Sequence, residues 1–232
     1  MNKIFTILAI TIISTNAYSQ KKTEDTTGYN LADAQLVCLK IQAYYNKIKT
    51  FKSNFRQVFT KRFHGDQKPE SGVLYITKPG KMTWEYTTPE KKFFIVDGKK
   101  AWVYEPLNKQ ALWKNISDSG LPAPVKFLWG KGNLIAEFNV KIIKNSKFAG
   151  KNETVLKLVP KKRSPHYKSV LFVTDSSGAV KQSIVYDHEG NRNRIYFSSI
   201  VLDKTIPEST YIFKAPKGVM VMEAGTEKKA NK

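Results

Sequence analysis

The first regular pattern in the chain is a helical one. Leu31, Ala34, Cys38, Ile41, Tyr45 and Ile48 follow one another at steps of three and four residues, with charged side chains between them. Such spacing places the apolar side chains along one stripe of an α-helix. Asn30 is suited to cap its first turn. About 19 residues of helix would be roughly 28 Å long, enough to lie across a sheet.

From Phe51 onward the period changes to two, which is typical of β-strands. Phe51, Ser53, Phe55, Gln57 and Phe59 share one face of the expected strand, and the other face carries Lys52, Asn54 and Arg56. Turn signals then recur every several residues, between short runs rich in Val, Ile, Phe, Tyr and Trp. Two four-residue loops, 175–178 and 187–190, begin with Asp and end with Gly, as tight hairpin turns do. The pattern predicts a meandering antiparallel sheet in a sandwich or a barrel.

The interior of this sheet is ambiguous from periodicity alone. The helix, the strands and the segment 122–130 all offer apolar faces, and the Pro and Gly that bound this segment predict a short helix there. A sheet with a helix laid on it can close tightly around these faces or leave a cavity for a ligand. The pattern does not distinguish a packed core from a lined pocket.

The ends of the chain differ from its middle. Lys3, the apolar run 4–13 and the small residues of Ala17-Tyr18-Ser19 are typical of a secretory signal peptide. We therefore expect residues 1–19 to be removed on export. Residues 20–232 are expected to form one domain with flexible ends, including a polar tail from Glu223.

The formal net charge of +20 does not by itself indicate a nucleic-acid partner. Of the 39 basic residues, 34 are Lys and 5 are Arg, and they are spread along the whole chain. Readout of nucleic-acid bases depends on Arg, so no nucleic-acid partner is expected. A solvated basic surface and attraction to anionic membranes or acidic partners both remain open.

Candidate chemistry is sparse. His64, His166 and His188 lie in or beside predicted turns without the spacing of a metal site, and Cys38 is the single cysteine. Asp97 and Asp187 precede tight turns, where Asp bonds its own backbone. The sequence therefore predicts no enzyme, no metal and no cofactor. A hydrolase using Asp187 or a histidine is the least favoured alternative.

One block carries a family resemblance. Residues 72–86, GVLYITKPGKMTWEY, are followed by Pro89, by the turn Asp97-Gly98-Lys99 and by the run 102–106, WVYEP. This block resembles the LolA family of periplasmic carriers of outer-membrane lipoproteins. The upstream helix and the residues Phe55-Arg56-Gln57, and downstream the segment 156–161 and the turn at 216–219, are similar to the same family.

The resemblance implies a mainly β fold, an incomplete, unclosed antiparallel β-barrel of about eleven strands with a helical lid over an apolar cavity. The cavity would take the acyl chains of lipoproteins. The expected partners are acylated lipoproteins, an inner-membrane lipoprotein-releasing ABC transporter, and an outer-membrane receptor or the outer membrane itself. The protein is expected to be a periplasmic monomer.

The resemblance also assigns residues. Those expected to line the acyl-chain cavity are Phe55, Met82, Trp84, Trp102, Phe127 and Leu128, and the short-helix proline of the family corresponds to Pro124. Those expected at the lid contact are Lys78, Ile41 and Tyr45.

Position 78 departs from the pattern of some family members. They carry Arg before the strand proline, where it ties the barrel to the lid, and this chain has Lys78. Lysine lacks the planar fork of donors, so the lid is expected to be latched differently. An alternative on the same fold is a carrier or sensor of other lipids, although the version with a lipid anchor lacks its Cys here.

Overall fold

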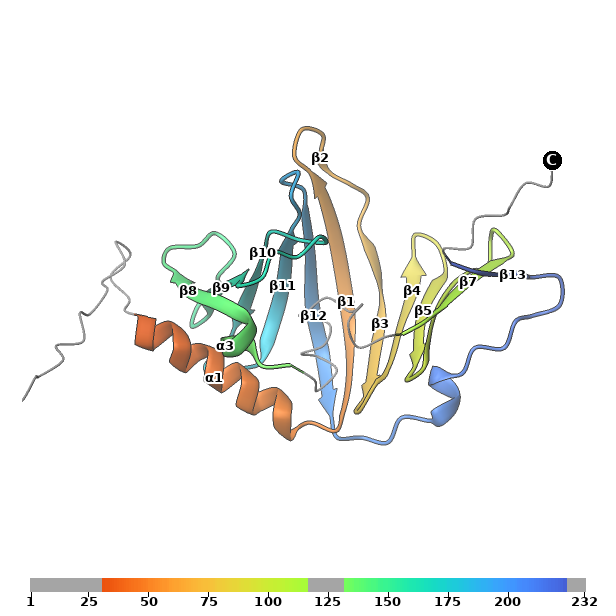
Figure 1. Cartoon of the computed structure of the whole chain (residues 1–232), viewed down its shortest axis with the longest axis horizontal. Helices are drawn as coiled ribbons and strands as arrows, with labels where there is room; N and C mark the ends of the chain where they lie inside the picture. Colours follow the sequence, from red (N-terminus) through yellow and green to blue (C-terminus); the bar gives the residue numbers. More distant parts are fainter. Residues whose placement is uncertain (1–30, 117–131, 225–232) are drawn as a thin grey trace, which may run out of the picture.

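The computed structural model describes residues 31–116 and 132–224 and consists mainly of one large β-sheet (Figure 1). The sheet has thirteen strands, which are β1 (Thr50–Lys61), β2 (Gly65–Asp66), β3 (Glu70–Thr77), β4 (Lys81–Thr88), β5 (Lys92–Asp97), β6 (Lys100–Glu105), β7 (Gln110–Asn115), β8 (Phe138–Ile143), β9 (Thr154–Pro160), β10 (Ser169–Thr174), β11 (Val180–Tyr186), β12 (Arg192–Leu202) and β13 (Met220–Glu223). Among the described residues, three helical elements accompany it: α1 (Leu31–Lys47), α3 (Leu134–Glu137) and the 3₁₀ helix η1 (Glu208–Tyr211).

The sheet is one unclosed antiparallel path with two short additions. Its order is β13-β7-β6-β5-β4-β3-β1-β12-β11-β10-β9-β8, and β2 pairs only with β1. Leaving out the two-residue β2 and the four-residue β13, eleven strands remain, and neighbours among them run antiparallel. Within the described residues the terminal strands β8 and β13 do not pair with each other. The prediction of an incomplete barrel of about eleven strands is confirmed.

Helix α1 covers one face of this sheet, which we call the inner face. Ala34, Cys38, Ile41 and Tyr45 are its buried residues, so the predicted stripe faces inward. The helix packs mainly on β8 and α3, and Figure 1 shows it running obliquely across the β8 side of the sheet. The buried side chains of the inner face form one core with α1, and they come from every strand on the path from β8 to β6: Phe51, Phe55, Leu74, Ile76, Met82, Val96, Ala101, Phe138, Val140, Ile142, Leu156, Leu158, Val170, Phe172, Val180 and Phe197.

The opposite, outer face is covered by different segments. Phe148, Val155, Leu171, Val173 and Ile184 form a second, smaller core beneath the loop after β8. At the other side of the sheet, residues 207–214, which we call the strap, cross β4 and β5 and include η1. Tyr211 of the strap is 1% exposed, and its hydroxyl lies 2.8 Å from Thr77 Oγ1.

The two hairpin turns form as their residues predict. In both turns the glycine has a positive φ, +93° at Gly178 and +88° at Gly190. In both, the aspartate accepts backbone N–H groups within the turn, from Ser177 to Asp175 at 2.9 Å and from Glu189 to Asp187 at 3.0 Å. Strands β10, β11 and β12 are thus joined by tight turns and pair antiparallel, with one register shift between Val173 and Thr174 of β10.

One prediction about the chain end needs correction. The polar tail was expected from Glu223, but strand β13 runs to Glu223 and pairs with β7 in parallel. Its backbone donors and acceptors find partners on β7 despite the polar side chain, because ladder formation depends on the main chain. The predicted signal peptide and the short helix over 122–130 lie outside the described residues.

Candidate functional site

The candidate site is the inner face of the sheet together with the C-terminal half of α1. Ile41 is fully buried against the sheet, and Tyr45 is 3% exposed. The hydroxyl of Tyr45 accepts a 3.3 Å hydrogen bond from the backbone N–H of Val180 in β11. Burial raises the pKa of Tyr45 above its ordinary value, because the charged phenolate would be desolvated; the hydrogen bond from Val180 opposes this.

Lys78 connects the turn between β3 and β4 to the same helix. It lies in the turn between β3 and β4, and its Nζ donates a hydrogen bond to the backbone carbonyl of Tyr45. That carbonyl belongs to the last turn of α1, where the helix dipole is negative and favours a cation. Burial lowers the pKa of Lys78 from its ordinary value, and the Asp203 carboxylate partly offsets the effect. The expected contact of Lys78 with the helix is present.

An aromatic group occupies the inner face of β1 and β4, beyond the main contact of α1. The ring of Phe55 meets Trp84 and Tyr86 edge-on, with both pairs of ring centroids 4.9 Å apart. Gly72 lies between Phe55 and Tyr86 in the register of β1, β3 and β4. A Cβ there would lie 1.9 Å from the carbonyl oxygen of Glu85, so only glycine allows this close approach.

Trp84 is the half-buried centre of this aromatic group. Its Nε1 donates a hydrogen bond to the sulfur of Met82 at 3.2 Å, so the buried side of the indole has a partner for its N–H. Its ring centroid lies 6.4 Å from that of Phe197 in β12. Met82 itself is 2% exposed and packs in the inner core. Phe55, Met82 and Trp84 therefore lie together on the face that α1 partly covers.

Trp102 does not join them, contrary to the sequence-based expectation. It pairs in register with Ile95, and its ring packs at 5.0 Å from Phe213 of the strap and 6.0 Å from Trp113. Its neighbour Ala101 is the residue of β6 that enters the inner core. Since side chains of a strand alternate between faces, Trp102 lies on the outer face.

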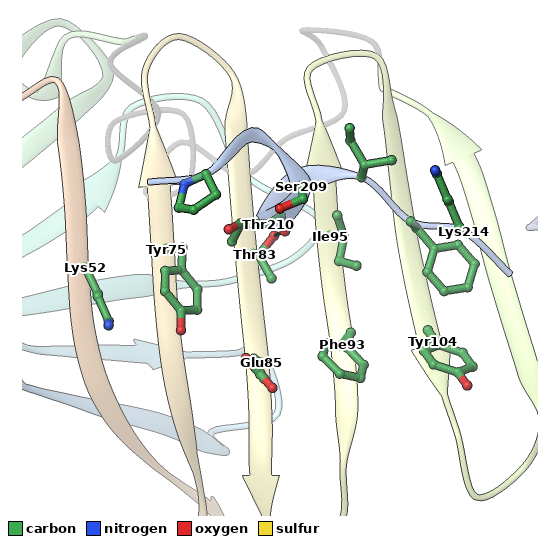
Figure 2. Close-up of a pocket in the computed structure, with 13 residues that line it drawn as sticks. Lys52, Tyr75, Thr83, Glu85, Phe93, Ile95, Tyr104, Ser209, Thr210 and Lys214 are labelled. Atoms are coloured by element: carbon green, nitrogen blue, oxygen red, sulfur yellow. Dashed lines mark hydrogen bonds between the residues drawn. The ribbon is translucent and has the colours of Figure 1, made fainter. Parts of the chain in front are cut away.

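The outer face has a hollow of its own below the strap, with a volume of about 790 Å³. Figure 2 shows Thr83 and Ile95 beside the strap residues Ser209 and Thr210, with Glu85, Phe93 and Tyr104 farther along their strands. Thr83 Oγ1 donates to the backbone carbonyl of Thr210 at 2.8 Å. The whole thickness of the sheet separates this hollow from the aromatic group around Trp84.

Two further predicted cavity residues, Phe127 and Leu128, lie outside the described residues, together with Pro124. The sequence reasoning missed Tyr86, Phe94 and Phe197, which pack on the inner core. Tyr86 could have been found, because it lies two residues after Trp84 in one strand and so faces the same way. Phe197 had no such local signal, since its neighbour Phe55 is far away in the sequence.

The residues with potential for catalysis are dispersed. His64, His166 and His188 are exposed, as predicted. Cys38 is fully buried in α1, and burial raises its thiol pKa to about 11, so the nucleophilic thiolate is disfavoured. In the described parts of the chain there is no group of three or more His, Cys, Asp or Glu residues that could hold a metal ion. None of the helices described there is long and apolar enough to cross a membrane.

Comparison with known families agrees with this geometry. The family described as outer membrane lipoprotein carrier protein LolA matches residues 46–214. The chain belongs to the LolA family. The matched region begins beside Tyr45 and ends at the last residue of the strap, so it includes the strands of the inner face and Lys78 in the turn between β3 and β4.

Curated relatives of this LolA-family chain share modest identity over most of its length. An outer-membrane lipoprotein carrier protein of Chromobacterium violaceum is 28% identical over 185 residues, 79% of this chain and 85% of the relative. One of Legionella pneumophila (strain Paris) is 26% identical over 225 residues, 96% of this chain and the full length of the relative.

A solved structure with lower sequence identity shares the fold. A conserved protein of Thermus thermophilus superposes with a TM-score of 0.51 at 13% identity, covering 82% of this chain and 99% of that chain. A LolA superfamily protein of Nitrosomonas europaea gives a TM-score of 0.43 at 15% identity, covering 78% and 97%.

Proposed function

We propose that this protein is a periplasmic chaperone that binds the acyl chains of lipoproteins and carries them from the inner to the outer membrane. The observation that carries the proposal is the inner face, which is apolar from β8 to β6 and is roofed by a helix over only part of its width. Membership of the LolA family supports the same function.

The physics of the cargo fits this site. Each CH₂ of an acyl chain gains about 0.8 kcal/mol when it leaves water, so a lipoprotein crosses an aqueous compartment only under cover. The half-buried rings of Trp84, Tyr86 and Phe94 offer apolar surface beside the inner core. The sulfur of Met82 next to Trp84 adds an adaptable lining.

Release requires that the roof can move. Helix α1 is joined to the sheet by apolar contacts of its stripe and by hydrogen bonds at its C-terminal end, through Tyr45 and Lys78. We infer that acyl chains enter between this end of α1 and the aromatic group around Trp84. A more hydrophobic acceptor would then take the cargo without any fuel, so no catalytic step is proposed. The transporter and the receptor or membrane at either end are those expected from the family.

Two tryptophans on opposite faces give the test a matched control. Trp84 lies on the inner face and Trp102 on the outer face. Binding of a synthetic triacylated lipopeptide, measured by titration calorimetry, should weaken about tenfold in Trp84→Ala, because a large contact surface is lost. Trp102→Ala should bind as the parent protein does.

Two results would count against the proposal. Equal weakening in both variants would show that the inner face is not the binding surface, and no binding of the lipopeptide by the parent protein would overturn carriage altogether. A phospholipid that competes on equal terms with the lipopeptide would instead favour a carrier of other lipids on the same fold.

A further inference from the structure

The most exposed large apolar side chain of the described residues is Phe63, with 83% of its surface accessible. It lies in the turn that joins β1 to β2, and Figure 1 shows this hairpin projecting beyond the other strands. Lys61 and Arg62 precede it, and the Arg62 guanidinium lies 5.1 Å from the centre of the Phe63 ring. The Phe63 ring therefore projects from the tip of the β1–β2 hairpin, beside the cationic side chains of Lys61 and Arg62.

Two other segments meet this tip. Residues 61–66, 161–168 and 187–191, together with Lys157 of β9, form what we call the basic corner. The backbone N–H of Arg62 donates to Asn191 Oδ1 at 3.1 Å. The side chain of Arg62 also lies against the turn, within 3.0 Å of where a Cβ of Gly190 would be. The segment 161–168 contacts the turn 187–191 through a 2.7 Å hydrogen bond between His188 Nε2 and the backbone carbonyl of Ser164.

A hollow of about 380 Å³ opens beside the tip on the outer face. Arg62, Lys157, Lys168 and His188 line it, and Leu171 and Tyr186 contribute apolar surface. Within the described part of the chain, the ion pairs of the protein leave out Arg62, Lys157 and Lys168. Asp187 is the one carboxylate among the lining residues, so Arg62, Lys157 and Lys168 outnumber it three to one.

The acidic groups of the corner are Asp66, Asp187 and Glu189, and each accepts hydrogen bonds from neighbouring residues. Asp66 lies 3.4 Å from Arg192 and accepts from Thr60 at 2.5 Å. Asp187 accepts the backbone N–H of Asn191 at 2.8 Å and the N–H of Glu189 at 3.0 Å, within its own turn. Lys162 and Arg163, both exposed, add further positive charge on the neighbouring loop. The corner thus presents net positive charge around a projecting ring.

We propose that the basic corner docks this protein onto a lipid surface that carries anionic headgroups. Phe63 enters the interfacial layer, where aromatic rings are favoured, and the cations around the hollow bind headgroup phosphates. One ring projecting from a hairpin tip offers a protein partner little contact area, whereas a membrane takes up a single protruding side chain. Docking requires no cargo, so it can fail while acyl-chain carriage holds.

Sedimentation with vesicles tests the docking. The chain from residue 20 onward keeps every described helix and strand and lacks the apolar run 4–13. It should bind vesicles of phosphatidylcholine mixed with phosphatidylglycerol, bind phosphatidylcholine alone far less, and lose binding as salt screens the charges. Phe63→Ala should weaken binding to the mixed vesicles about tenfold.

Matched controls separate the corner from general surface properties. Leu107, 74% exposed in the turn between β6 and β7, is a second projecting apolar side chain, and Leu107→Ala should leave binding unchanged. The triple variant Arg62→Gln, Lys157→Gln, Lys168→Gln should lose about fivefold per cation. The same charge change at Lys99, Lys151 and Lys204, outside the corner, should have a much smaller effect.

The two triple variants decide the outcome. Equal loss in both would show that net charge alone attracts the protein, and would overturn the assignment to this corner. Unchanged binding in Phe63→Ala would equally overturn it. Thermal unfolding followed by circular dichroism should give similar midpoints for all of these variants, because the substituted side chains lie at the surface or line an open hollow.

Discussion

At the scale of single residues, Lys78 contacts α1 although it is a lysine and not the arginine that the resemblance led us to expect. We expected lysine to hold the helix less firmly than arginine, because its ammonium group lacks the planar fork of donors of a guanidinium. Its acceptor here is the backbone carbonyl of Tyr45, at the negative end of α1. A single carbonyl needs one donor rather than a fork, and the helix dipole favours a point charge. The latch between sheet and helix therefore suits an ammonium group.

Replacement of Lys78 by methionine should loosen the helix end. Lys78→Met keeps the length of the side chain and removes its donors, so we expect a loss of about 1 kcal/mol in the free energy of unfolding. Amide hydrogens in the last turn of α1 should exchange faster, as measured by hydrogen–deuterium exchange. Lys81→Met removes only the partly exposed pair with Glu208 and should leave the α1 amides unchanged. Unaltered exchange in Lys78→Met would contradict the latch.

At the scale of elements, the sequence predicted best those helices and strands that have one buried face and one solvent-exposed face. Helix α1 and the first half of strand β1 have that contrast and form as expected. In the second half of β1 the alternation reverses, because Val58 is buried and Phe59 is 36% exposed. Strand β6 lacks it, because Ala101, Trp102 and Val103 are apolar in succession. Nothing in that run indicates which face enters the core, and so Trp102 was assigned to the wrong side of the sheet.

The strap was also beyond sequence-based prediction. Residues 207–214 form a single 3₁₀ turn and otherwise irregular chain, whose position depends on tertiary contacts such as that of Tyr211 with Thr77. The residues of the candidate site divide in the same way, into those that the local sequence indicates and those that only tertiary contacts bring together. Met82 and Trp84 came from a local block with a family resemblance, whereas Phe197 is brought to Trp84 only by the pairing of β12 with β1.

The turn between β10 and β11 fixes the position of α1 and offers a sharp test of packing. Gly178 has a φ of +93°, and a Cβ there would lie 2.6 Å from the backbone carbonyl of Lys40 in α1. Gly178→Ala should therefore cost about 2 to 3 kcal/mol of unfolding free energy, because the strained turn must also push the helix away. Chemical denaturation measures this loss.

Gly65 provides the control for that substitution. Its φ is +72°, and a Cβ there would have nothing within 4 Å. Gly65→Ala should cost only the backbone strain, about 1 kcal/mol. Equal losses in Gly178→Ala and Gly65→Ala would show that close packing of the turn on α1 contributes nothing to stability.

At the scale of the whole molecule, one continuous sheet carries two differently covered faces and two open ends. The inner face is roofed by α1 and the outer face by the strap and by the loop after β8. Beyond the strap, the four residues of β13 pair with four of the six residues of β7, which would otherwise be an unpaired edge. Unpaired strand edges are templates for association between chains, so β13 has a protective position.

Truncation tests this protection. A chain that stops after Lys214 loses β13 and keeps the strap, and we expect it to fold but to associate at high concentration through the exposed edge of β7. A chain that stops after Ala224 keeps β13 and should remain monomeric. Light scattering during concentration measures the difference. A monomeric chain ending at Lys214 would show that β7 needs no cover.

The turn between β3 and β4 has neighbours on both sides of the sheet. Lys78 reaches the carbonyl of Tyr45 on the inner side, and the preceding residue, Thr77, contacts Tyr211 of the strap on the outer side. Two adjacent residues thus link covers that lie on opposite faces. If the strap stabilises the turn in the conformation that holds α1, thermodynamic reciprocity requires that α1 stabilises the strap contact by the same coupling free energy. We therefore expect Thr77→Val, which removes the contact with Tyr211, to speed amide exchange in the last turn of α1 as well as in the strap.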